Sequence, residues 1–316
     1  MAAKYDNVIV FGPTGTVGGH TALEANRRGA KVWLAMRDPS KPIEEIPTNV
    51  EQAGNFSRVQ ADLTDPASVA KAIRDTGAKA AYVYAIHGSS DHMRGVLQAM
   101  KDAGVEYIVF LSSASIEQDA DIRSIPKEEF IPYAHAQIEV AVEDLGFPYF
   151  TALRPYKFAS NYFRLSLNKS AKPPKASIIY LDALADNIVP EDIGLVGGAV
   201  LVNRPSNSSK EIIYLCGPEI KKTEENWALI KRVTGRDDID TTPLSEEDFI
   251  QNMLKDSPAP IAHYLAKSME SMRHRARVYP DTMYVPAVAN VKKYTGREAT
   301  KFEDYIEAHK AEWQAF

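Results

Sequence analysis

The chain has 316 residues, a hydrophobic content of 45%, a charged content of 25% and a formal net charge of −5. These values are ordinary for a globular protein, and the lack of a lysine- and arginine-rich block argues against a nucleic-acid partner. No apolar stretch approaches the roughly 20 residues that a membrane helix needs, which argues against a membrane partner.

The cysteine count and the N-terminal residues indicate the cellular compartment. Cys216 is the only cysteine, which excludes an intrachain disulfide and a cysteine-rich metal site. The first residues lead directly into a strand candidate and leave no room for a signal peptide. We therefore expect a cytoplasmic protein with no bound metal.

The most informative segment is YDNVIVFGPTGTVG, residues 5–18. An apolar strand candidate, residues 8–11, ends at Gly12, and Gly15 and Gly18 follow at three-residue steps into a helical segment. Glycine lets the backbone approach a pyrophosphate, and the free N–H groups of the first helical turn point at the anion. The pattern predicts a dinucleotide site on these three glycines.

Strand and helix candidates alternate over the first half of the chain. The expected strands cover residues 8–11, 31–36, 58–61, 80–86, 107–111 and 149–153. The expected helices cover residues 15–28, 66–76, 91–103 and 134–145, and several of them end at a glycine. The strands are nearly continuous apolar runs, which is typical of burial on both faces of a parallel sheet. The pattern predicts an α/β fold with a doubly wound parallel sheet of the Rossmann type.

The second half of the chain is less regular. The expected strands there are residues 177–181 and 212–215, and the expected helices are residues 190–202 and 224–234. The tail is helical, and its last helix has an apolar stripe that we interpret as core: Phe302, Tyr305, Ile306, His309 and Trp313. We expect a cofactor-binding Rossmann domain over residues 1–155. A smaller mixed α/β substrate-binding region, residues 156–316, is expected to be interwoven with it.

The end of the second strand bears on the choice between NAD and NADP. The position at which NAD-binding proteins place an acid holds Met36, and Arg37 follows it. A guanidinium suits a 2′-phosphate, and Lys41 can add a second charge. The alternative is a solvated pair between Arg37 and Asp38. The sequence favours NADP(H).

Three more strand ends contribute residues to the same edge of the sheet. Asp62 and Leu63 follow the third strand, where the carboxylate could hold the adenine amino group or cap the next helix. Ala85 and Ile86 end the fourth strand and let a cofactor lie flat, and His87 is either a loop residue or a donor in a substrate pocket. The fifth strand is followed by two hydroxyls that could bind cofactor or a substrate carbonyl, Ser112 and Ser113.

Four stretches together resemble a known family: GPTGTVG, AMRDPSK, HAQIEVAVEDLGFPYFTALRPYKFASN and YLCGPEIKKTEENWALIKRVTGR. The chain is similar to the NmrA-like and isoflavone reductase-like group of atypical (extended) short-chain dehydrogenase/reductases, which includes reductases and redox sensors. The resemblance implies NADP(H) on Gly12, Thr14, Gly15, Thr16, Val17 and Arg37. It also implies cofactor contacts from Pro155, Tyr156 and Phe158. A substrate pocket is implied at Tyr156, Asn161, Tyr162 and Phe163.

The chain departs from the family at its catalytic pair. Reductases of the wider family pair a tyrosine acid with a lysine four residues on, and no Tyr-x-x-x-Lys occurs here. Counting back from Gly146, the lysine position holds His135 and the tyrosine position holds Ile131, with Tyr133 two residues away. Ser113 occupies the family's serine position. His135 could deliver a proton near neutral pH, or it could only bind the ribose or cap the helix.

Two functions of different classes follow. The first is an NADPH-dependent reductase of a small aromatic, quinone-like or enone substrate, with His135, Ser113 and Tyr133 as catalytic residues. The second is a non-catalytic redox sensor that binds NADP(H) and acts through a protein partner, which the missing dyad favours. The basic residues 273–277 could face such a partner or form a solvated helix face.

Overall fold

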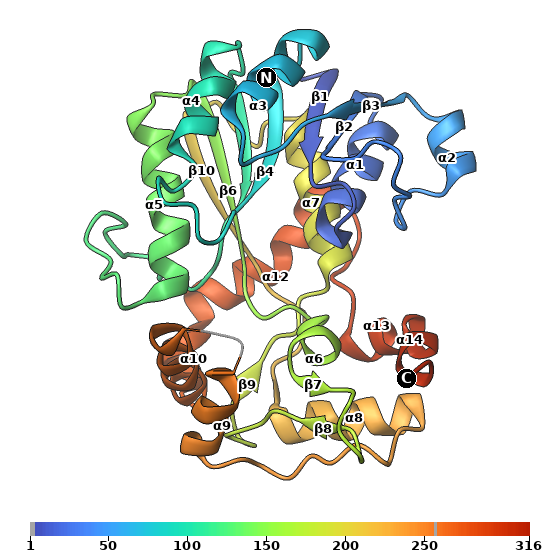
Figure 1. Cartoon of the computed structure of the whole chain (residues 1–316), viewed down its shortest axis with the longest axis vertical. Helices are drawn as coiled ribbons and strands as arrows, with labels where there is room; N and C mark the ends of the chain where they lie inside the picture. The colour runs from blue at the N-terminus through green and yellow to red at the C-terminus, as the bar shows by residue number, and fades with distance from the viewer. Residues whose placement is uncertain (1–3, 256–257) are drawn as a thin grey trace.

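The computed structural model describes residues 4–255 and 258–316. Its centre is a sheet of parallel strands in the spatial order β10-β6-β5-β4-β1-β2-β3 (Figure 1). The strands are β1 (Asn7–Phe11), β2 (Lys31–Met36), β3 (Phe56–Gln60), β4 (Ala80–Tyr84), β5 (Tyr107–Leu111), β6 (Tyr149–Pro155) and β10 (Lys210–Leu215). The order 3-2-1-4-5-6 is that of a doubly wound dinucleotide-binding sheet, which β10 extends by one strand. The predicted fold class is confirmed.

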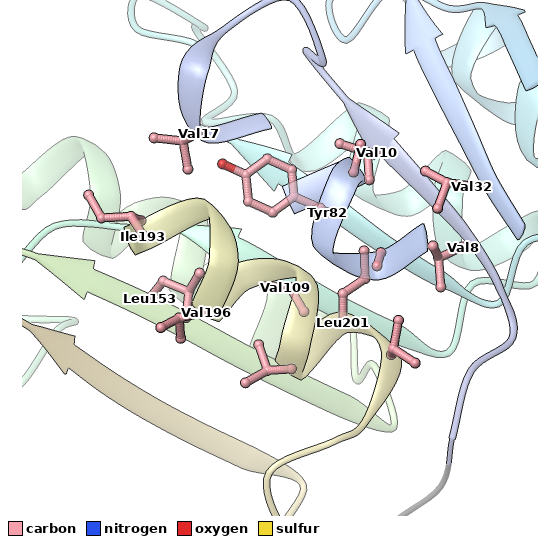
Figure 2. Packing of buried hydrophobic residues seen from close by; sticks show 14 of the residues in the cluster. Val8, Val10, Val17, Val32, Tyr82, Val109, Leu153, Ile193, Val196 and Leu201 are labelled. Carbon is pink, nitrogen blue, oxygen red and sulfur yellow. The ribbon is translucent and has the colours of Figure 1, made fainter. Parts of the chain in front are cut away.

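Helices cover both faces of the sheet. One face carries α1 (Thr16–Arg27), α7 (Pro190–Val202) and α12 (Asp281–Thr295). The other carries α3 (Pro66–Thr76), α4 (Arg94–Asp102) and α5 (Phe130–Asp144). Side chains of β1 alternate between the two cores: Val8 and Val10 join the first, and Ile9 and Phe11 join the second. Figure 2 shows Val8 and Val10 in the packing around α7.

The contact between α1 and α7 depends on glycine. A Cβ at Gly194 would lie 2.7 Å from the Val17 carbonyl oxygen, and one at Gly198 would lie 2.5 Å from the Thr21 carbonyl oxygen. Real side chains cannot approach backbone that closely, so the two helices meet through their backbones. A helix from late in the sequence therefore fixes α1 against the sheet.

A smaller lobe lies beyond the carboxyl ends of the strands (Figure 1). Its elements are α6 (Asn161–Arg164), β7 (Leu167–Asn168), β8 (Lys175–Ala176), β9 (Leu184–Ala185), β11 (Lys221–Lys222), α8 (Thr223–Thr234), α9 (Glu246–Met253), α10 (Ala259–Ser271), α11 (Arg275–Val278), α13 (Phe302–Ala308) and α14 (Lys310–Gln314). Phe302, Ile306 and Trp313 are buried in the core of this lobe and Tyr305 packs against it, which confirms the interpretation for four residues of the apolar stripe. His309 is half-buried and lies 3.4 Å from the Glu191 carboxylate, so it is not part of this core. The stripe spans two helices, because the chain leaves the helical conformation at His309.

Several expectations about elements were wrong, and one helix was not predicted. The fourth strand ends at Tyr84 and not at residue 86, and α5 begins at Phe130 and not at residue 134. Residues 177–181 form no strand; the short strands β8 and β9 lie on either side of them. Helix α4 begins at Arg94 and not at residue 91, because the Asp91 carboxylate accepts from the backbone N–H groups of Met93 and Gly95. The short helix α2 (Thr48–Ala53) was not predicted. Within the described ranges, no helix has the length and apolarity to cross a membrane.

Candidate active site

The glycine loop between β1 and α1 leaves a cradle that fits a pyrophosphate. Gly12 has a φ of +69°, and its carbonyl accepts from the Gly15 N–H at 3.2 Å. A Cβ at Gly18 would lie 2.2 Å from the Gly12 carbonyl oxygen, so only glycine lets α1 start this close to β1. A Cβ at Gly15 would meet nothing nearer than 3.7 Å. Open space therefore lies over Gly15, where the phosphates are expected.

The first turn of α1 is open to an anion. Gly15 precedes the helix, no side chain caps it, and the first bond to the Gly15 carbonyl comes from Gly19 at 2.8 Å. The N–H groups of Thr16, Val17 and Gly18 are therefore available at the positive end of the helix dipole. Arg164 of α6 donates to the Thr16 hydroxyl at 3.3 Å, so the smaller lobe places a cation beside this turn. No motif in the sequence pointed to Arg164.

The end of β2 carries the cation that is predicted to bind the 2′-phosphate. Arg37 follows β2, and the Asp38 carboxylate accepts from the Ser40 hydroxyl at 2.6 Å. Among the described residues no ion pair joins Arg37 to Asp38, so the charge of Arg37 is not neutralised by its neighbour. Lys41 is exposed in the following loop, where its carbonyl accepts from Arg58.

The end of β3 is only partly free for a cofactor. Hydrogen bonds from Thr64 lower the pKa of Asp62, and the charge of Arg37 adds to this. Asp65, and not Asp62, caps α3 by accepting from the Ala67 N–H. The Leu63 side chain is buried in the core, so only its backbone faces the cofactor edge.

A cavity of about 190 Å³ lies between the end of β4 and α5. It is lined by Ala85, Ile86, His87, Gly88, Ser89, His92, Lys127, Phe130, Tyr133, Ala134 and Ile138. The structure thus brings four predicted site residues together: Ala85, Ile86, His87 and Tyr133. Burial lowers the pKa of His87, which keeps its ring neutral at pH 7.

His135 lies behind this cavity and not on its surface. Its ring is 8% exposed and packs edge-on against His87, with ring centroids 5.6 Å apart. Burial lowers its pKa to about 3, and the charges of His87 and Arg154 add to the effect. The expectation that His135 titrates near neutral pH is therefore wrong, because a desolvated imidazole beside a guanidinium resists protonation. Its buried Nδ1 makes no hydrogen bond to any residue that the structure describes.

A buried ion pair lies one helical turn further along α5. Arg154 and Glu139 are joined at 2.7 Å, and both are almost completely buried. The Ser112 hydroxyl donates to the same carboxylate at 2.6 Å, and Arg154 also donates to the Tyr214 hydroxyl at 2.8 Å. The Ser112 hydroxyl is therefore committed to the fold. Glu139 was not among the predicted site residues, although a single acid inside the apolar run of α5 could have indicated a buried ion pair.

The other serine remains closer to solvent. The Ser113 hydroxyl is half-buried and shares a hydrogen bond of 2.9 Å with the Ser115 hydroxyl. It stands after β5, at the edge where the cofactor is expected.

The predicted substrate residues that follow β6 do not lie together in the structure. Pro155 ends β6, Tyr156 packs on Tyr279 with ring centroids 5.0 Å apart, and Phe158 forms a β-bridge with Ile188. Asn161 begins α6.

Two of the predicted substrate residues lie in the core of the smaller lobe. Tyr162 is 1% exposed against Trp227 and Phe302, and Phe163 packs on Trp313. Neither lines the cavity beside Tyr133.

The comparisons with known proteins agree with this geometry. The sequence profile of an NAD(P)H-binding family matches residues 12–182. The NADPH-dependent quinone oxidoreductase QOR2 of Escherichia coli, solved with NADPH, shares the fold with a TM-score of 0.69 at 18% identity, over 95% of this chain and 99% of that chain. Glycine cradle, sheet order and family profile together define an NAD(P)H-binding α/β protein.

Relatives in sequence define the group more closely. The nitrogen metabolite regulation-like protein bik4 of Gibberella fujikuroi is 38% identical over 96% of each chain. The isoflavone reductase homolog IRL of Zea mays is 23% identical over 84% of this chain and 86% of that protein. The chain belongs to the NmrA-like, isoflavone reductase-like group of atypical short-chain dehydrogenase/reductases, as its motifs predicted.

Proposed function

We propose that the protein is an NADPH-dependent reductase of a small aromatic, quinone-like or enone substrate. The observation that carries this proposal is the cavity beside the end of β4. It is mostly apolar, and it contains the Tyr133 phenol and the His87 imidazole together with Ser89, His92 and Lys127. It lies at the end of β4, on the same sheet edge as the glycine loop. The quinone oxidoreductase of the same fold supports the reductase class.

The proposed cofactor contacts follow from the backbone N–H groups that are available at the start of α1. The backbone of residues 12–18 and the first turn of α1 bind the pyrophosphate, and Arg37 binds the 2′-phosphate that distinguishes NADP from NAD. Ala85, Ile86 and the segment from Pro155 to Phe158 flank the nicotinamide. When bound, the reduced nicotinamide supplies the hydride.

Tyr133 is the proton donor in this proposal. Its side chain lines the cavity, where a phenol can donate to the oxygen on which negative charge develops. His87, neutral at pH 7, donates a hydrogen bond to the same oxygen, and Ser113 at the end of β5 can add another. His135 acts through His87, because the two rings are in edge-on contact. It is a positioning residue.

The experiment is a screen for NADPH oxidation with quinones and enones, followed by variants. Tyr133→Phe is expected to lower kcat about 100-fold, which is typical of the loss of a general acid. Tyr294→Phe, on α12 of the opposite face, is the matched control and keeps full activity. Turnover that survives Tyr133→Phe unchanged would remove Tyr133 from the chemistry.

The second candidate function is a redox sensor. His135 stays neutral and cannot carry the charge of the missing lysine, and the relative bik4 is named as regulation-like. The basic stretch gives this candidate little support, since Arg273 pairs with Asp182 at 3.0 Å and Arg275 with Asp281 at 2.9 Å. Strong preference for NADP⁺ over NADPH, with no oxidation of any acceptor, would favour the sensor.

A further inference from the structure

Arg164 is a cation of the smaller lobe that reaches the start of α1. It is the last residue of α6, and its Nη2 donates to the Thr16 hydroxyl at 3.3 Å. Thr16 is the first residue of α1, where the N–H groups that are available to a pyrophosphate begin. Figure 1 shows α6 in the smaller lobe, beyond the carboxyl ends of the strands. A residue of the smaller lobe therefore contacts the predicted phosphate site of the sheet.

The position of α6 is fixed from two sides. Inside the lobe, Tyr162 is buried and Phe163 packs against the same core. Before α6, the Ala159 N–H donates to the Ile188 carbonyl at 2.9 Å. Ile188 leads into α7, which meets α1 through its backbone. The helix that fixes α1 against the sheet therefore also fixes the start of α6, so Arg164 is held beside α1 before any cofactor binds.

Within the described ranges, the Arg164 guanidinium has no anionic partner. It forms no ion pair there, and the bond to Thr16 is its only hydrogen bond. Two acids lie in the same surroundings, near Tyr305, and each of them is paired with a histidine at 3.4 Å. These pairs are Glu45 with His20 and Glu191 with His309.

The bond to Thr16 leaves most of the hydrogen-bonding capacity of Arg164 unused. A neutral hydroxyl at 3.3 Å is a weak acceptor for a guanidinium, because charge-assisted hydrogen bonds are shorter, at about 2.7–2.9 Å. The Arg164 side chain is also exposed, so a ligand can reach it. Its remaining N–H groups are therefore available to an anion at the start of α1.

A pyrophosphate in the glycine cradle would supply that anion. Each of its phosphates carries a negative charge, whereas the amides of α1 offer only the partial charge of the helix dipole. Gly15, which has open space over it, is the neighbour of Thr16 in the sequence. A phosphate in this space would lie beside Arg164, and a guanidinium binds phosphate oxygens through parallel N–H groups.

We propose that Arg164 binds the pyrophosphate of the cofactor, so that the smaller lobe and the glycine loop hold the dinucleotide together. Arg37 and Arg164 then bind different parts of NADP(H): Arg37 binds the 2′-phosphate, and Arg164 binds the pyrophosphate. The inference rests on the proposed cofactor contacts and adds one residue to them. It is tested with fragments that are not turned over, so its failure and a missing reductase activity are separate results.

The first experiment is calorimetry of the full chain with NADP⁺ and with two fragments that separate its phosphates. ADP-ribose has the pyrophosphate and no 2′-phosphate, whereas 2′-AMP has the 2′-phosphate and no pyrophosphate. Arg164→Met is expected to weaken NADP⁺ and ADP-ribose roughly tenfold to a hundredfold and to leave 2′-AMP unchanged. Arg37→Ala is expected to weaken 2′-AMP and to leave ADP-ribose unchanged. The control Lys169→Met removes an exposed cation of the same lobe and keeps all three affinities.

Two results of this calorimetry would overturn the proposal. Equal losses for ADP-ribose and 2′-AMP in Arg164→Met would show that the residue supports the fold of the site. An unchanged affinity for ADP-ribose and NADP⁺ would show that Arg164 does not touch the pyrophosphate. An unmodified protein that binds none of the three ligands would overturn the cofactor site itself, and the role of Arg164 with it.

The second experiment uses the unmodified chain and labels its arginines with phenylglyoxal, read by mass spectrometry. Saturating ADP-ribose is expected to slow labelling of Arg164 at least ~10-fold, because it covers the guanidinium, and 2′-AMP is expected to leave the rate unchanged. Arg232, an exposed arginine of the same lobe that is paired with Glu303, is expected to react at the same rate with either ligand. Protection of Arg164 by both fragments alike, or by neither, contradicts the proposal. This measurement also decides if Arg164→Met does not fold.

Discussion

At the scale of single residues, His135 shows the largest difference between the role expected from its sequence position and the chemistry that its surroundings allow. The motif spacing predicts that it occupies the family's lysine position, yet burial beside Arg154 keeps its ring neutral. Two of the polar residues that line the cavity, Tyr133 and His87, were in the predicted set, whereas Ser89, His92 and Lys127 were not. What the sequence could not show was which of these side chains face the same space, because that depends on how α5 is rotated against β4.

The burial of His135 has a measurable consequence for stability. Its pKa in the fold is lowered to about 3, whereas histidine in an unfolded chain titrates at about 6.5. Between these values the unfolded chain binds the additional proton, so stability falls as pH falls. We expect the wild type to lose about 1.4 kcal/mol more per pH unit than His135→Gln between pH 6 and pH 4. Urea unfolding of both proteins measures this difference, and parallel pH profiles would contradict it.

In the proposed function, Arg37 selects NADPH over NADH. Arg37→Ala is expected to weaken NADPH roughly tenfold to a hundredfold, since a charged contact contributes about 1.5–3 kcal/mol. NADH lacks the 2′-phosphate and is expected to bind as before. Calorimetry with both nucleotides measures this, with Arg232→Ala, an exposed arginine paired with Glu303, as control. Equal losses for NADPH and NADH would refute the assignment.

At the scale of elements, local sequence signals predicted most strands of the sheet and the bounds of several helices. Helices α3 and α7 have the predicted bounds, because Pro66 and Pro190 open them and their apolar runs are long. The prediction of a strand over residues 177–181 was wrong, because a short apolar run such as SIIYL is equally compatible with a strand and with an irregular buried segment. Its Ile178 and Ile179 are buried without pairing in a sheet.

The backbone contact between α1 and α7 gives a prediction about stability. Gly198→Ala is expected to cost about 1–3 kcal/mol, because the new methyl group would lie 2.5 Å from the Thr21 carbonyl oxygen. The matched control is Gly95→Ala in α4, where the nearest atom belongs to the movable Asp91 side chain at 3.0 Å. Chemical denaturation measures both. Similar free energies of unfolding for the two variants would contradict the account of this interface.

At the scale of the whole molecule, the two halves of the sequence share one sheet. Strand β10 pairs with β6, and α7 covers residues from the first half such as Tyr82 and Leu153 (Figure 2). Sequence periodicity located these elements but not their partners, because long-range pairing leaves no local pattern. The boundary at residue 155 stays a prediction.

This sharing predicts the behaviour of a fragment. Residues 1–155 alone lack α7, β10 and α12, so only α1 would cover that face of the sheet and much of its apolar surface would be exposed. We expect that fragment to bind a hydrophobic dye and to unfold without a cooperative transition. Thermal unfolding followed by near-UV circular dichroism tests this. A sharp transition with native-like signals would show that the first half folds independently.

The central claim is that the open amides at the start of α1 bind the pyrophosphate of a pyridine nucleotide. Calorimetric titration of the unmodified protein and of Gly18→Val with NADPH and NADP⁺ tests it most directly, since a side chain at Gly18 would fill the approach of α1 to the Gly12 carbonyl. We predict saturable binding to the unmodified protein and its loss in Gly18→Val. An unmodified protein that binds neither nucleotide at millimolar concentration would contradict the account.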